Sequence, residues 1–168
     1  MPISLPTGGD STADMREVLT TRVLFPPLDF TTARGKQVAA IILCRALYNL
    51  VHLFLAGYSR WPFVIALWHV ADQCVANYCV TLIAEAEGER RVFGGRLRFS
   101  RKHFDIFLVV LAVIHVFWVF ILIACILSYA IFFGVTGGEV LAVVEVAILP
   151  IAWIASRPEA DEGDLGLA

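Results

Sequence analysis

Charged residues are scarce in this sequence, and that scarcity excludes an ordinary soluble domain. Only 17% of the 168 residues are charged and 59% are hydrophobic, whereas a soluble domain is typically about 45–50% apolar. Nearly all the charges fall in residues 1–36, Glu85–Asp105 and 157–168. This segregation is typical of membrane insertion, because a charge at the bilayer centre costs roughly 2.5–3.5 kcal/mol.

The sequence also lacks the signatures of disulfide frameworks, glycoproteins and secreted precursors. It has four cysteines, which lie in apolar runs without a C-x-x-C pair, so free thiols are expected. No N-x-S/T acceptor occurs, and the N-terminal segment has no apolar signal-peptide core, so the first span is expected to direct insertion. The net charge of −2 does not suggest nucleic acid as a partner, and no motif predicts a cofactor or a bound metal.

Runs of about 20 apolar residues predict four membrane-spanning helices. The fourth run is the shortest and contains Pro150, which neighbouring helices can accommodate in the last turns of a membrane helix. We therefore expect an all-α integral membrane protein, a four-helix transmembrane bundle. The predicted spans are residues 38–56, 62–83, 106–133 and 140–155.

Basic residues predict which side of the membrane each loop occupies. The connection GERRVFGGRLRFSRKHFD carries six arginines and lysines, which mark the cytoplasmic side, whereas GYSRWP carries one and GVTGG none. Both the N- and C-termini are then expected in the cytoplasm. The predicted organisation is a cytoplasmic N-terminal segment (1–35), a four-span membrane domain (36–156) and an acidic cytoplasmic tail (157–168).

The N-terminal segment contains a weak helical pattern from Asp10 to about Phe25, ended by the sequence FPP. One interpretation is an amphipathic helix lying along the inner leaflet, and the other is a partly disordered leader.

Polar side chains inside the predicted spans are the most informative feature, because each must face protein or water rather than lipid. In the first span they recur at helical spacing and form one stripe. The second span carries another such group, and the last two spans add one residue each. These residues are Arg45, Asn49 and His52; His69, Asp72, Gln73 and Asn77; His115; and Glu145.

The depth of each side chain follows from the ~1.5 Å rise per helical residue. Arg45 and Asp72 both fall near the predicted midplane, so a buried Arg45–Asp72 ion pair is expected. His52, His69 and Glu145 share a level nearer the outer face, where they converge if the first, second and fourth helices are neighbours.

These polar residues have a structural interpretation and several functional ones. Structurally, Asn49, Gln73, Asn77 and His115 extend the ion pair into a polar seam that holds the bundle together. Functionally, two histidines and a carboxylate could bind non-haem iron or zinc, two histidines could ligate a haem, and His, Asp and Glu could relay protons. The candidate catalytic residues are His52, His69, Asp72 and Glu145.

Two patches carry a resemblance to a known family. They are RGKQVAAIILCRALYNLVHLFLAGY in the first span and AVIHVFWVFILIACIL in the third. Together with four spans, short outer loops and a basic inner loop, they resemble the small fungal MARVEL-type tetraspan proteins over about Arg34 to Ala155. The deep Arg45 and Asp72 and the short GVTGG loop depart from that family's usual pattern. The resemblance implies membrane organisation or trafficking rather than chemistry.

The predicted function is therefore that of a multi-pass membrane protein, non-enzymatic, which organises membrane or serves as an accessory subunit. Its expected partners are the lipid bilayer and either further copies of itself or other membrane proteins. The alternative is a small membrane-embedded enzyme or proton-coupled carrier for a lipophilic substrate. That alternative would use the intramembrane His, Asp, Glu and Arg side chains.

Overall fold

Long helices make up most of the chain in the computed structural model, which describes residues 16–57, 60–127 and 138–160. The first and third helices begin five residues before the predicted spans, because the charged residues there continue the helix beyond its apolar part. Residues 128–133 of the predicted third span lie outside the described part. The long helices are α2 (Ala33–Ala56), α3 (Pro62–Glu85), α4 (Arg101–Leu127) and α6 (Gly138–Ala155).

Three of these helices are long and apolar enough to cross a membrane, judged by length and composition. The qualifying segments are Ala33–Phe54, Pro62–Glu85 and Arg101–Leu127, and Val144–Ala155 is a shorter apolar segment within α6. The α6 helix continues through Pro150 to Ala155. The structure therefore has three helices of spanning length and a shorter apolar one where the sequence predicted four spans.

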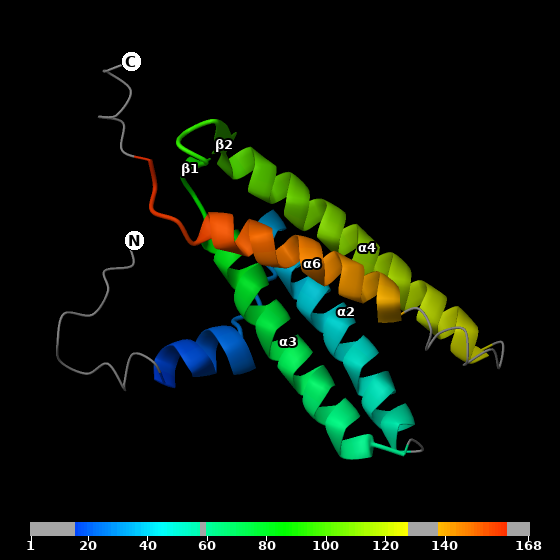
Figure 1. Cartoon of the computed structure of the whole chain (residues 1–168). Coiled ribbons are helices and arrows are strands. Elements are labelled where there is room, and N and C mark those ends of the chain that lie inside the picture. The colour runs from blue at the N-terminus through cyan, green and yellow to red at the C-terminus, as the bar shows by residue number, and fades with distance from the viewer. Residues whose placement is uncertain (1–15, 58–59, 128–137, 161–168) are drawn as a thin grey trace, which may run out of the picture.

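The α2 helix lies between α3 and α4, and α6 packs against α3 (Figure 1). The first turns of α2 and α4 lie at the same end of the molecule as the last turns of α3 and α6. The main apolar core is concentrated near this end. Its most buried members include Ile41, Val80, Ile83, Phe104, Leu108 and Ile148.

The outside of the helices is covered with large apolar side chains. A soluble monomer rarely exposes a continuous apolar surface of this kind. Water would be a poor solvent for such a surface, because the helices bury only one side of each apolar sequence. Examples on three helices are Phe54, Phe63, Trp68, Phe117 and Phe120.

A compact cap fixes the start of α2. The Thr32 hydroxyl accepts a hydrogen bond from the Gly35 backbone N–H at 3.0 Å, as an N-cap residue does. Asp29 in turn accepts hydrogen bonds from the hydroxyls of Thr31 and Thr32. Gly35 is required here, because a Cβ at this position would overlap the backbone oxygen and the side chain of Asp29.

A β-hairpin occupies the basic connection between α3 and α4. Strand β1 (Arg90–Val92) pairs antiparallel with β2 (Leu97–Phe99), with Arg91 opposite Arg98. Residues 93–95 of its turn have positive φ, a conformation that suits the two glycines in FGG. The sequence predicts only a charged loop here, because three-residue strands are too short to produce a periodic pattern.

The N-terminal segment packs against α3. Residues 16–18 are helical and continue into a π-helical turn, η1 (Leu19–Leu24). Arg22 forms an ion pair with Glu85 near the end of α3 at 3.1 Å. The helix predicted from Asp10 to Phe25 is thus helical from residue 16 to Leu24, and its first part lies outside the described residues.

Candidate functional site

Arg45 and Asp72 join α2 to α3 halfway along both helices. Arg45 Nε donates to Asp72 Oδ2 at 2.9 Å, and Arg45 Nη2 donates to Oδ1 at 2.5 Å. This two-point contact is the strongest geometry available to an arginine and a carboxylate. Arg45 is only 2% exposed, so its charge has been withdrawn almost completely from solvent and depends on its partners.

Glu145 brings α6 to the same guanidinium. Its Oε1 atom lies 2.9 Å from Arg45 Nη2, although the angles fall outside those of a hydrogen bond. One cation therefore faces two carboxyl groups from two different helices. The three residues form a charge cluster of Arg45, Asp72 and Glu145, which is electrically neutral when one carboxyl group carries a proton.

Asn49 links this charge cluster to the side chains around it. Its Nδ2 atom donates to Gln73 Oε1 at 2.9 Å and to Asp72 Oδ2 at 3.3 Å. Its Oδ1 atom lies 2.9 Å from His69 Nδ1. Because an amide oxygen only accepts, His69 must carry a proton on Nδ1 in this contact.

A chain of amide side chains continues from Asn49 to the N-terminal segment. Gln73 Nε2 donates to Asn77 Oδ1 at 2.7 Å, and Asn77 Nδ2 donates to the backbone oxygen of Val23 at 2.9 Å. The polar seam, which comprises the charge cluster with Asn49, His69, Gln73 and Asn77, thus reaches η1. Most donors and acceptors along it are matched, as buried polar groups require.

An aromatic cluster covers the side of the polar seam nearer the short loop between α2 and α3. The His52 ring lies 5.0 Å from His69 and 4.2 Å from Tyr48, measured between ring centroids. His52 Nε2 is buried without a hydrogen-bond partner in the described part of the chain. Tyr48 is buried, whereas the His52 and His69 side chains are half-buried.

His115 of α4 lies apart from these contacts. Its Nδ1 atom bonds the backbone oxygen of Leu111 one turn earlier at 2.8 Å, and its ring is almost completely buried. Its Nε2 atom and the Trp118 indole nitrogen have no hydrogen-bond partner among the residues that the structure describes. The hydrogen bonds of the polar seam therefore do not extend to His115.

Arg34 has a structural role that the sequence does not predict. It donates from Nε to Asp105 Oδ1 at 2.6 Å and from Nη1 to the backbone oxygens of Ala84 and Ala86. It thus caps the end of α3 and ties that end to the start of α4. The sequence contained a signal for this ion pair, since Arg34 and Asp105 carry opposite charges near helix ends that are predicted on the same side of the membrane.

The residues predicted to meet near the outer face divide into two groups. His52 and His69 lie next to each other, but Glu145 contacts Arg45 at the deeper level. No cluster of three or more His, Cys, Asp or Glu side chains suited to a metal ion occurs within residues 16–57, 60–127 and 138–160. Chemically, the arrangement can neutralise buried charge and hold or pass a proton.

Comparisons with known proteins yield no relative from which a function could be transferred. No protein-family model, curated protein or solved structure matches this chain.

Proposed function

We propose that this chain is a multi-pass membrane protein that crosses the bilayer with four helices and acts without catalysis. In this proposal it organises membrane or serves as an accessory subunit through lateral contacts. The lipid bilayer surrounds it, and its protein partners are further copies of itself or other membrane proteins. We also propose that the chain is similar to the small MARVEL-type tetraspan proteins, which its first and third spans resemble.

The observation that carries the proposal is the opposite placement of polar and apolar side chains. Arg45, Asp72 and Glu145 point toward one another between three helices, while large apolar residues such as Phe117 and Phe120 cover the outside. A bilayer favours this arrangement, because lipid solvates apolar side chains and cannot hydrogen-bond polar ones. The inward-facing groups are mostly satisfied by one another, which supports a structural role.

The distribution of basic residues supports a cytoplasmic location for both termini. The hairpin and the adjoining helix ends carry Arg90, Arg91, Arg96, Arg98, Arg101 and Lys102. The opposite end has only Arg60 in the loop between α2 and α3. The positive-inside rule then assigns the hairpin end to the cytoplasm.

Two measurements on microsomal membranes test this topology. An inserted protein stays in the membrane pellet in alkaline carbonate. The sequence has no N-x-S/T acceptor, so a single glycosylation acceptor can be inserted into one loop at a time within a Gly-Ser extension. Its glycosylation then reports whether that loop lies on the lumenal side of the membrane. We expect glycosylation of an extension after Gly57 and none of an extension between Gly94 and Gly95. The reverse pattern would invert the proposed orientation.

The charge cluster favours a second candidate, a membrane-embedded enzyme or proton-coupled carrier for a lipophilic substrate. One guanidinium facing two carboxyl groups leaves one carboxyl group able to take up and release a proton. His69 belongs to the polar seam through its contact with Asn49, and His52 lies beside His69. The two rings would provide a route for that proton.

Native mass spectrometry of the protein in mild detergent separates the two candidates. A stoichiometric metabolite, haem or metal would support the enzyme or carrier, whereas a species carrying only lipid supports the organising role. The variant Asp72→Asn adds a second criterion. In an organising protein it lowers stability or assembly, and in a carrier it abolishes transport while the protein still inserts and folds.

A further inference from the structure

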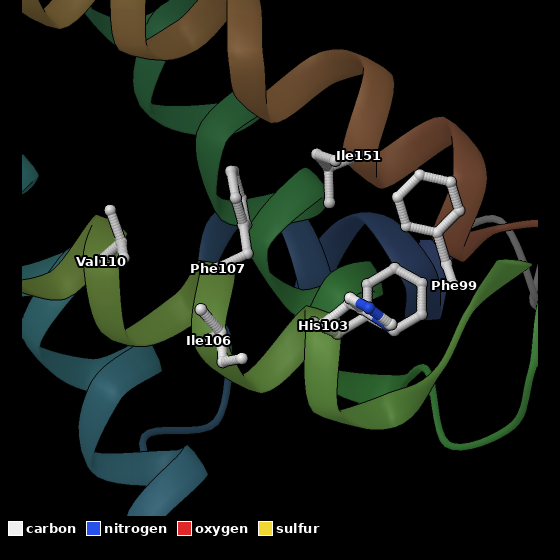
Figure 2. Close-up of a pocket in the computed structure, with 7 residues that line it drawn as sticks. Phe99, His103, Ile106, Phe107, Val110 and Ile151 are labelled. Carbon is white, nitrogen blue, oxygen red and sulfur yellow. The ribbon is translucent and has the colours of Figure 1, made fainter. Parts of the chain in front are cut away.

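A shallow apolar groove lies where α4 and α6 meet the end of β2 (Figure 2). Its volume is about 240 Å³, and Ile106 and Val110 on its wall are 62% and 50% exposed. The groove is therefore open along its side. Its lining includes Phe99 from β2, Ile151 from α6, and His103, Ile106, Phe107 and Val110 from α4.

His103 is a polar side chain on the wall of this otherwise apolar groove. Its Nδ1 atom accepts a hydrogen bond from the Ser100 backbone N–H at 3.0 Å. A neutral ring that accepts at Nδ1 carries its proton on Nε2. Among the described residues no protein group is hydrogen-bonded to Nε2, so this donor is available to a ligand at the hairpin end of the groove.

A basic side chain extends the polar end of the groove. Lys102 lies one helical turn before Ile106, so both belong to the same side of α4. Side chains on a helix lean toward its N-terminus, so an extended Lys102 side chain can reach toward the hairpin. Arg101 lies about 100° around the helix from Lys102 and one turn before Asp105. The Asp105 carboxylate pairs with Arg34 of α2.

We propose that the groove binds one acyl chain of an anionic phospholipid, with its phosphate against Lys102 and His103 Nε2. The proposal rests on the proposed membrane topology, which puts the hairpin end of α4 at the inner leaflet. An acyl chain gains little by leaving lipid for an apolar groove, because both surroundings are equally apolar. The preference for one lipid over another must therefore come from the headgroup contacts.

Two pairs of adjacent residues provide matched variants. Lys102→Gln and Arg101→Gln each remove one exposed positive charge from the same helical turn, and Lys102 is the nearer of the two around the helix to Ile106 on the groove wall. Val110→Trp fills the groove, whereas Val109→Trp adds the same side chain beside it on an exposed position outside the lining. The Lys102 variant alters a solvated side chain, so it tests the site even if Val110→Trp fails to fold.

The experiment is native mass spectrometry of protein released from nanodiscs of equal parts phosphatidylglycerol and phosphatidylcholine. We expect Lys102→Gln to lower the ratio of retained phosphatidylglycerol to phosphatidylcholine about tenfold, because it removes a charge-assisted contact with the phosphate. Arg101→Gln should change it much less. Val110→Trp should reduce the number of retained phosphatidylglycerol molecules by one, and Val109→Trp should leave it unchanged.

Equal losses in Lys102→Gln and Arg101→Gln would overturn the proposal, because they indicate diffuse attraction to the basic hairpin. Unchanged retention in both Lys102→Gln and Val110→Trp would overturn it too. Alkaline carbonate extraction of the same protein separates this failure from a failure of the topology. A protein that is extracted contradicts both proposals, whereas an inserted protein without the preference contradicts the lipid site alone.

Discussion

Arg45 of α2 and Asp72 of α3 form a two-point ion pair near the middle of both helices, with Arg45 almost completely buried. Glu145 of α6 approaches the same guanidinium. A single side chain thereby connects the consecutive helices α2 and α3 to α6, which is distant from both in sequence. Removal of either carboxylate should therefore affect the packing of the whole molecule, not just one helix pair.

Asp72→Asn should lower the free energy of unfolding by about 3 kcal/mol, because it leaves the buried Arg45 charge with only the less favourable Glu145 contact. The measurement is unfolding in mixed micelles followed by helical circular dichroism. The double variant Arg45→Met/Asp72→Leu is the control, since it removes both charges together. It should be more stable than Asp72→Asn, and a double variant that is less stable would contradict the account of an uncompensated charge.

Asn49→Leu should have a smaller effect, a loss of about 1–2 kcal/mol in the free energy of unfolding. It removes the hydrogen bonds to Gln73 and Asp72 and the contact with His69, and interhelical hydrogen bonds in membranes average ~0.6 kcal/mol each. A double-mutant cycle with Gln73→Leu measures the coupling. Leu50→Ala, at an outward-facing position beside Asn49, is the matched control and should be nearly neutral. A coupling energy of zero would exclude the Asn49–Gln73 bond.

Arg34→Lys should destabilise the hairpin end even though it retains the positive charge. Lysine cannot reproduce the fork by which Arg34 reaches Asp105 and the carbonyls of Ala84 and Ala86 at once. We expect a loss of about 1–3 kcal/mol, because partly buried acceptors lose their donors, together with faster amide exchange in the last turn of α3. The exposed Lys36→Arg is the control. Equal stability of the Arg34→Lys variant and the wild type would show that charge alone suffices.

Order in the turn before α2 should depend on pH through Asp29. Hydrogen bonds from Thr31 and then Thr32 lower the pKa of the Asp29 carboxyl group from 3.8 to about 2. A lowered pKa means that the folded turn favours the carboxylate. Its contribution is complete above pH ~4 and disappears as the pH falls through about 2.

Amide exchange of residues 31–36 at several pH values checks this dependence. Protection corrected for the intrinsic exchange rate should fall between pH 4 and pH 2 in the wild type. Asp29→Asn retains an acceptor oxygen without a titrating group, so its corrected protection should stay constant over that range. A parallel fall in both proteins would assign the pH dependence to another group.

The hydrophobic runs carried enough information to predict the long helices, since about 20 apolar residues in succession have few alternatives to a buried or membrane-spanning helix. The ends of the helices were harder to predict. The α2 and α4 helices begin before the apolar runs, and the ion pair between Arg34 and Asp105 joins their charged first turns. The hairpin could not be predicted because each of its strands has only three residues, too few to show a periodic pattern.

Helical spacing also limited which polar residues could meet. The positions of Arg45 and Asp72 along their helices suggested a common depth, and the structure places the two in contact. Depth alone did not show which helix faces lie together, so Glu145 was grouped with His52 and His69 although it contacts Arg45. Nor did it reveal that Asn77 reaches Val23, since that hydrogen bond joins residues 54 positions apart.

The sequence by itself determined that the chain forms long apolar helices, that its charges gather in the connections and terminal segments, and which polar residues occupy the helix interiors. These properties follow from composition and from the 3.6-residue period. Only the tertiary structure decided the partner of each polar group. Hydrogen bonds and ion pairs are directional and short in range, so they depend on helix order and rotation, which the packing of the whole chain sets.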